Sequence, residues 1–205
     1  MDWGAVAERQ RGRFEQAETA VFRGNAAYGA ALALLMSGQG EDARALLEEA
    51  AAAWRESWAD ATPTSWGRPI GVIKALLLAG DDDGAAAAAE WALSLGCENA
   101  ESPIGRYAAA LALLTLGRFV DARHQATSIR ARDDFPGDVA DAAAFIAADD
   151  VVAYAEAVES VLASFESRDG YLEDVAVADT VLVLQLLAAR RGIVHELPPS
   201  TVLPA

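Results

Sequence analysis

Few residues in this chain have the side-chain types and the spacing that catalysis or metal binding requires. The sequence of 205 residues contains two histidines, His124 and His195, and a single cysteine, Cys97. The histidines lie far apart, and neither belongs to a metal-ligand spacing such as H-E-x-x-H. Glu196 follows His195, but nothing completes a site, and His124 is expected to have a surface or interface role. One cysteine excludes an intrachain disulfide and a cysteine-based metal site.

Three runs of carboxylates could in principle bind calcium or form an acid–base pair. They occupy residues 81–83, 149–150 and 173–174. Each run lies beside an expected helix start, where the helix dipole favours negative charge, and the alanines at 85–89 offer no calcium ligand. No G-x-S-x-G, Walker or dinucleotide motif is present. We therefore expect no catalytic residues, no metal and no cofactor, and a protein that is not an enzyme.

Another set of residues has the types that suit binding. Trp and Arg are enriched at the energetic centres of protein interfaces, and the first helices of helical-hairpin arrays commonly line the binding surface. Packing between repeats is an alternative role for the two tyrosines, because they recur at one register. The expected partner-binding residues on these helices are Tyr28, Trp66, Arg68, Arg106 and Tyr107.

These residues belong to a chain with an internal repeat. Residues 28–44 (YGAALALLMSGQGEDAR) and residues 107–123 (YAAALALLTLGRFVDAR) align without a gap. The copies begin about 80 residues apart, which fits two helical hairpins, and residues 73–80 (IKALLLAG) supply an intervening copy. The first helix of each copy is expected to end in a left-handed glycine, namely Gly38, Gly80 and Gly117.

The apolar periodicity predicts an all-α fold, an irregular tetratricopeptide-like array of about four helical hairpins in one domain. A leading helix, capped by Asp2, is expected within residues 1–23 and runs to about Phe22. The hairpins occupy residues 24–167, with Ser65 as the cap of the helix that begins at Trp66. A C-terminal capping helix at residues 175–191 and an extended tail at 192–205 complete the chain.

The capping helix is apolar nearly all round, so it should be deeply packed. We expect it to close the open end of the array, with Val181, Leu184 and Leu187 buried. No apolar run reaches the roughly 20 residues that a membrane helix needs, and the N-terminus lacks the apolar region of a signal peptide. A cytoplasmic protein with no membrane partner is expected.

Charge is the strongest signal in the composition. The formal net charge is −15, and Lys74 is the only lysine among 16 basic residues. Phosphates would be repelled, so nucleic acid is not an expected partner, whereas a basic protein would be attracted. GC-rich coding or a high-salt cytoplasm would also produce an acidic, lysine-poor chain, and the sequence leaves these alternatives open. It also leaves the oligomeric state open.

Two family resemblances follow from these residues. The pairs Gly38 with Ala43 and Gly117 with Ala122 resemble tetratricopeptide-type repeats, in which these positions permit close helix packing. Residues 183–193 (VLQLLAARRGI), followed by an extended end with Leu203-Pro204, look like the ending of the immunity protein 49 family. That resemblance implies an all-helical protein that neutralises a toxin by binding it, with no catalytic residues.

Three functions are therefore weighed. The first is a non-catalytic protein-binding module, with an immunity-type inhibitor of a basic toxin as its specific form. The second is a generic tetratricopeptide-like adaptor or assembly scaffold. The third is an enzyme or a small-ligand binder, which a polar pocket with convergent titratable groups would favour.

Overall fold

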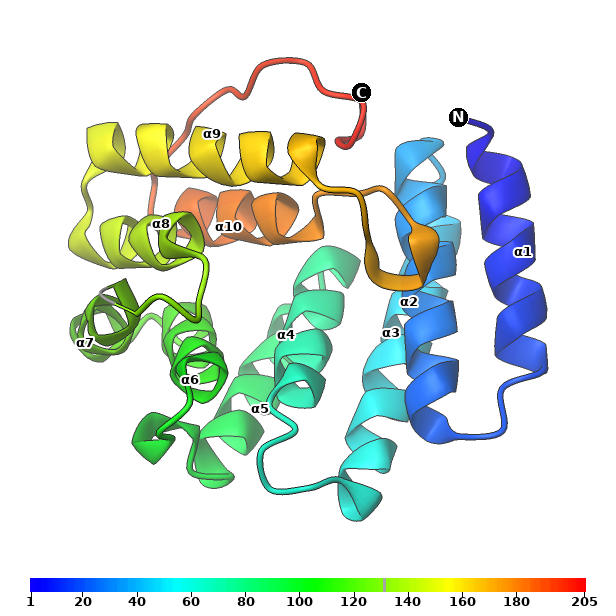
Figure 1. Ribbon diagram of the computed structural model, residues 1–205, viewed down its shortest axis with the longest axis horizontal. Helices are drawn as coiled ribbons and strands as arrows, with labels where there is room; N and C mark the ends of the chain where they lie inside the picture. Colours follow the sequence, from blue (N-terminus) through cyan, green and yellow to red (C-terminus); the bar gives the residue numbers. More distant parts are fainter. Residues whose placement is uncertain (131) are drawn as a thin grey trace.

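Figure 1 shows a computed structural model that describes residues 1–130 and 132–205. This part of the chain holds ten α-helices, three short 3-10 helices and no β-strand, which confirms the all-α fold class. The 3-10 helices are η1 (Trp58–Asp60), η2 (Cys97–Asn99) and η3 (Leu172–Asp174). The α-helices are α1 (Trp3–Glu15), α2 (Ala20–Met36), α3 (Gly40–Ser57), α4 (Gly67–Ala79), α5 (Asp82–Ser94), α6 (Pro103–Thr115), α7 (Phe119–Arg130), α8 (Gly137–Ala148), α9 (Val151–Ser167) and α10 (Asp179–Arg190).

The helices form an array in which neighbours along the chain pack against each other. The pairs α2–α3, α4–α5, α6–α7 and α8–α9 are helical hairpins, and α1 packs on α2 ahead of them. First helices of successive hairpins also touch, because α4 contacts α6 and α6 contacts α8. The fold is therefore an all-helical array of the repeat type that the glycine spacing predicted.

Side-chain caps and glycines set the ends of these helices. Asp2, Asp81, Ser102 and Asp150 each accept a hydrogen bond from the first turn of the helix that follows. Three glycines that end first helices have positive φ, which confirms the expected left-handed turns, namely Gly38 at 75°, Gly80 at 69° and Gly117 at 70°.

Three expected boundaries are wrong. The leading helix ends at Glu15 rather than near Phe22, because Thr19 accepts a hydrogen bond from the Phe22 N–H and starts α2. Ser65 does not cap α4, since its hydroxyl contacts that of Thr62 at 3.0 Å instead.

The last helix begins at Asp179 and not at Val175. Residues 175–178 are not helical: the Val177 N–H donates to the Val175 carbonyl at 2.9 Å, and the N–H of Ala178 donates to the carbonyl of Val202 in the tail at 2.8 Å.

The C-terminal part of the chain folds back over the array. Helix α10 packs on α8 and α9, as a cap on the last hairpin would, and it also reaches α4 in the middle of the array. Val181, Leu184 and Leu187 are buried, as expected. The segment between α9 and α10 descends toward α2, and the tail runs back along α9 (Figure 1). The C-terminal third therefore connects the two ends of the array.

Within the described residues, no helix combines the length and the apolarity that crossing a bilayer requires.

The positive φ of Gly117 gives a stability test with a matched control. A Cβ at Gly117 meets only Phe119 at 3.9 Å, so substitution by Ala acts through the backbone and not through a clash. An L-residue in this conformation costs about 1–2 kcal/mol. Gly12 lies within α1 with open space around it, and there Ala is better than Gly by about 0.5–1 kcal/mol. We expect Gly117→Ala to lower the free energy of unfolding in urea and Gly12→Ala to raise it; the same sign for both would contradict the turn assignment.

Candidate functional site

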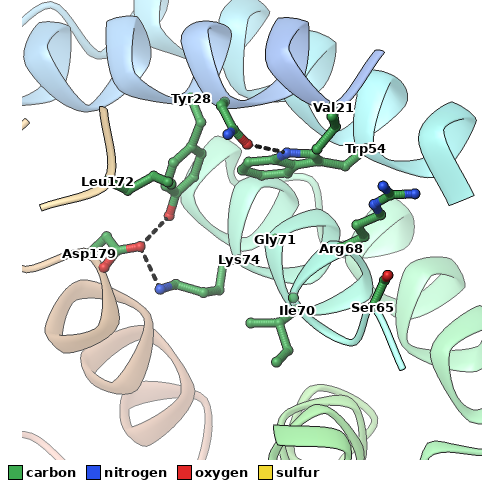
Figure 2. Close-up of a pocket in the computed structure, with 12 residues that line it drawn as sticks. Val21, Tyr28, Trp54, Ser65, Arg68, Ile70, Gly71, Lys74, Leu172 and Asp179 are labelled. Atoms are coloured by element: carbon green, nitrogen blue, oxygen red, sulfur yellow. Dashed lines mark hydrogen bonds and ion pairs between the residues drawn. The ribbon is translucent and has the colours of Figure 1, made fainter. Parts of the chain in front are cut away.

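A pocket between α2 and α4 brings together residues from distant parts of the chain (Figure 2). We call it the α2–α4 pocket; its volume is about 400 Å³. Its walls are mainly apolar, and its polar residues include one arginine, one lysine and one aspartate. The residues used below are Val21, Trp54, Ile70, Leu172, Arg68, Lys74 and Asp179.

Trp54 of α3 is the aromatic wall of this pocket. A Cβ on Gly24 would approach the Trp54 ring to 2.6 Å, and a Cβ on Gly71 would approach it to 2.7 Å. Both glycines are therefore required for the indole to lie between α2 and α4. The indole N–H donates to the Asn25 side chain at 2.9 Å, and the Tyr28 ring lies 5.1 Å away. The wall is thus fixed by packing and by one hydrogen bond.

A buried polar cluster occupies one end of the pocket. The Tyr28 hydroxyl donates to Asp179 Oδ2 at 2.9 Å, and the Lys74 ammonium lies 2.5 Å from the same oxygen. The ammonium also donates to the Thr180 hydroxyl at 3.0 Å. The cluster joins α2, α4 and the first turn of α10, where a carboxylate is favoured by the helix dipole. Since Lys74 and Asp179 neutralise each other, the cluster as a whole carries no net charge.

Burial controls the ionisation of the aromatic hydroxyls near this cluster. Burial, followed by the charge of Asp179, raises the pKa of Tyr28 well above its ordinary value. The same two causes, in the same order, raise the pKa of Tyr107. Both phenols are therefore neutral at physiological pH. Lys74 is held by two acceptors, Asp179 and Thr180, which fix the direction of its ammonium.

Arg68 lies at the other end of the pocket, beside Ser65 (Figure 2). Its guanidinium donates to the backbone carbonyl of Ser57, which fixes its direction. Within the described residues Arg68 forms no ion pair. The pocket therefore offers apolar walls between a neutral polar cluster and one oriented cation.

The structure separates the five residues that the sequence proposed for partner binding. Only Tyr28 and Arg68 line the α2–α4 pocket. Trp66 is 7% exposed and packs beside Trp58, with ring centroids 5.9 Å apart. Tyr107 is also 7% exposed, and Arg106 lines a separate hollow with His124. Both Trp66 and Tyr107 are buried in this conformation, and their part in partner binding stays a prediction.

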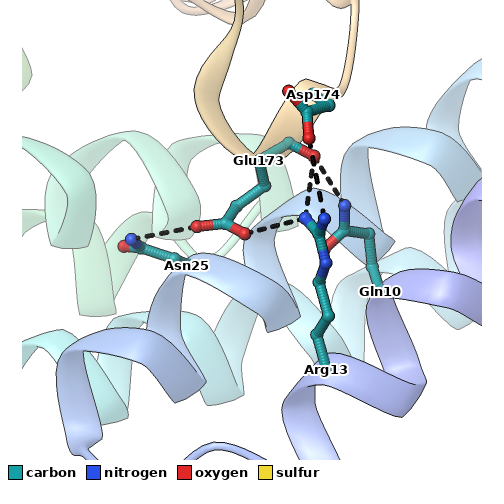
Figure 3. Close-up of polar contacts among 5 residues, drawn as sticks. All are labelled: Gln10, Arg13, Asn25, Glu173 and Asp174. Atoms are coloured by element: carbon teal, nitrogen blue, oxygen red, sulfur yellow. Dashed lines mark hydrogen bonds and ion pairs between the residues drawn. The ribbon is translucent and has the colours of Figure 1, made fainter.

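The strap is our name for residues 168–178, which link α9 to α10 and pass beside the pocket. Glu173 and Asp174 have φ of 53° and 58°, a conformation that non-glycine residues adopt rarely. Figure 3 shows side chains of α1 and α2 holding this turn. Gln10 donates to the Glu173 carbonyl at 2.7 Å, Arg13 donates to its carboxylate at 3.1 Å, and Asn25 donates to the other oxygen at 3.3 Å. These contacts place Leu172 at the pocket mouth, where it is 52% exposed.

Residues away from the pocket offer less chemistry. Cys97 is buried, and burial raises the pKa of its thiol to about 12, so the reactive thiolate is suppressed. His195 pairs with Glu159 at 2.9 Å on the surface. In the described parts of the chain, no group of three or more His, Cys, Asp or Glu residues is placed to hold a metal ion.

Sequence reasoning did not identify Asp179, Trp54 or Leu172 as site residues. Two signals were present in the sequence: Asp179 is the only charge in an otherwise apolar stretch, and Lys74 is the only lysine. A lone charge in an apolar helix needs a partner when buried, and here the two charges are partners. Nothing in the sequence indicates that Leu172 borders the pocket, because that depends on the path of the strap.

Comparison with known proteins adds no identification. No family model, curated protein or solved structure matches the chain. The resemblance to the immunity protein 49 family thus gains no support from these comparisons, whereas the repeat-type helical fold is directly visible in the structure.

The Tyr28 hydroxyl can be tested by its effect on stability at two pH ranges. Near pH 7, Tyr28→Phe removes a hydrogen bond to a charged group, and we expect a loss of about 1.5–3 kcal/mol. A phenol with a raised folded-state pKa contributes stability that is complete below the unfolded value near 10 and is lost as pH rises above it. Between the unfolded and the folded pKa, each such phenol lowers the free energy of unfolding by about 1.4 kcal/mol per pH unit.

Urea unfolding at pH 7 and between pH 10 and 11 measures both effects. We expect Tyr28→Phe to be less stable at pH 7 and to lose less stability than the native protein on going to pH 11. An alkaline slope identical to that of the native protein would contradict the burial of an un-ionised Tyr28.

Proposed function

We propose that this protein is a non-catalytic binding module that contacts another protein through the α2–α4 pocket. The observation that carries the proposal is the pocket mouth, where Leu172 is 52% exposed beside the apolar walls formed by Val21, Trp54 and Ile70. An exposed apolar side chain that continues the apolar lining of a hollow belongs to the kind of contiguous apolar surface that marks interaction sites and binding grooves. A volume of about 400 Å³ suits one large apolar side chain of a partner, which would anchor the complex.

The net charge of −15 favours a basic partner at long range. Attraction between the whole molecules accelerates association, and salt screens it over about 10 Å at 0.1 M. The pocket supplies short-range apolar contacts. Among the described residues that line it, the only uncompensated charge is Arg68. The proposal therefore separates a salt-sensitive rate of association from a salt-insensitive apolar anchor.

An immunity-type inhibitor is the specific form of this proposal, and a tetratricopeptide-like adaptor is the generic form. The resemblance of the C-terminal residues supports the first form, and the repeat-type array supports both. An inhibitor would suppress the activity of its partner in a purified mixture, whereas an adaptor would leave that activity intact. The cytoplasmic location expected from the sequence is part of the proposal in either form.

A second candidate function is the binding of a small ligand, with or without catalysis. The observation that favours it is the convergence of Tyr28, Lys74 and Asp179 at one end of the pocket. Against catalysis, the Lys74 ammonium is engaged by Asp179 and Thr180. Turnover of a small molecule by the purified protein would replace the first proposal with this one.

Filling the pocket is the direct test of the protein-binding proposal. Gly67 lines the pocket and is the first residue of α4, and a Cβ added there would have no atom within 4 Å. Gly67→Leu should therefore fold normally while occupying the site. Gly137 is the first residue of α8 and has equally open surroundings, so Gly137→Leu is the matched control.

The measurement begins with affinity capture on the native protein, identification of captured proteins, and direct binding of each purified candidate. We expect Gly67→Leu to lower the binding affinity for the true partner by about tenfold or more. Gly137→Leu should leave that affinity unchanged. The association rate of the native protein should fall as salt is raised from about 50 to about 300 mM. A partner that binds both variants equally well would remove the pocket from the interface.

A further inference from the structure

The end of the strap nearest α1 differs from the rest of it in burial. None of residues 168–174, which we call the strap tip, is buried. Val175, Val177 and Ala178, which form the strap base, are each at most 2% exposed, and the Ala178 N–H is bonded to Val202. Apolar burial thus fixes the base, whereas the tip gains little from the hydrophobic effect.

Tyr171 anchors the first part of the tip, because its ring packs beside Phe165 with centroids 6.4 Å apart and its hydroxyl donates to the Phe165 carbonyl. Polar contacts hold the part of the tip that follows Tyr171. They converge on Glu173, whose carbonyl and carboxylate are held by Gln10, Arg13 and Asn25 (Figure 3). Arg13 also lies 3.6 Å from the Asp174 carboxylate. Two successive left-handed residues oppose these contacts, since each costs about 1–3 kcal/mol when the residue is not glycine. The stability of the closed tip is therefore the difference between these polar contacts, which we call the latch, and the strain of the backbone.

The tip also borders a second hollow. Next to the α2–α4 pocket is a smaller cavity of about 140 Å³ with which it shares lining residues. Leu172, Tyr28 and Asp179 line both hollows. Movement of Leu172 away from Tyr28 would join them into a single groove over the polar cluster.

We infer that the strap tip is a latched gate of the binding groove: it opens about the buried base, and an apolar segment of the partner takes the place of Leu172. This inference rests on the proposed function for the identity of the ligand, while the opening itself does not. An open groove presents the Tyr28 ring, Leu32 and Phe165, which are apolar surfaces suited to such a segment. Only the open form admits the segment. The apparent affinity is therefore the affinity of the open form multiplied by the fraction of molecules that are open.

Amide hydrogen exchange, followed by NMR, tests the gate without any partner. The Asp174 N–H donates to the Tyr171 carbonyl and the Val175 N–H donates to the Leu172 carbonyl, both at 3.1 Å. Both acceptors belong to the tip, so both amides report on its opening, although Val175 itself lies in the base. The Ala178 N–H reports on the base. We expect Arg13→Ala to accelerate exchange of the first two by about tenfold, as loss of a charged hydrogen bond requires, and to leave Ala178 unchanged.

Arg9→Ala is the matched control, because Arg9 is exposed on the same helix and forms no hydrogen bond or ion pair with the strap among the described residues. Equal exchange at Asp174 and Val175 in both variants would overturn the latch. Acceleration at Ala178 by the same factor would also overturn the inference, because the whole strap would then unfold rather than the tip.

A second measurement connects opening with binding. The purified partner should bind Arg13→Ala more tightly by the same factor that exchange accelerates. Leu172→Ala, which opens the passage without touching the latch, should also tighten binding while leaving exchange at Asp174 unchanged. If the partner is sensitive to Gly67→Leu but indifferent to both of these variants, the gate is wrong and the proposed function stands. If no protein partner binds, the function fails, and the exchange experiment still decides whether the latch exists.

Discussion

The buried carboxylate of Asp179 is the constraint on which the arrangement of this protein depends. Its side chain is 17% exposed and would be costly to bury alone. Lys74 and Tyr28, from the second and first hairpins, both direct their polar atoms at it. Removal of the Asp179 carboxylate would leave the buried Tyr28 hydroxyl without its hydrogen-bond partner and would break the ion pair of Lys74. The cluster therefore forces α10 to lie across the middle of the array, a position that an apolar cap on the last hairpin alone would not need.

The pocket results from the packing of one large residue among small ones on the surrounding helices. Much of the core consists of alanine, which permits close helix packing but leaves little to fill irregular space. Trp54 enters between α2 and α4 only because Gly24 and Gly71 lack a Cβ. Once the indole is there, the helices cannot close over the space beside it. The hollow thus follows from one bulky residue wedged among glycines and alanines.

Local signals in the sequence were sufficient for the repeat and insufficient for the site. Gly38 and Gly117 predict their turns because the left-handed conformation is a property of a few consecutive residues. The helix end at Glu15 was missed although Thr19 is a recognisable cap, since the apolar spacing continues through it to Val21. Val175 was placed in a helix, but valine is a poor match for a helix start, and the bond from Ala178 to Val202 ties this segment to the tail instead. That bond joins segments whose proximity only the folded chain defines.

The residues that line the pocket were harder to predict because their positions depend on contacts between the two ends of the chain. Tyr28 and Tyr107 share a register in the repeat, yet only Tyr28 has Asp179 as a hydrogen-bond partner; the Tyr107 hydroxyl is buried with none among the described residues. Residues that repeat in sequence therefore cease to be equivalent once the C-terminal third folds over them. The strap adds to this asymmetry, because Glu173 is held by side chains of α1 and α2, at the opposite end of the array from α9. An irregular array thereby acquires the α2–α4 pocket at the place where its last segment meets its first hairpins.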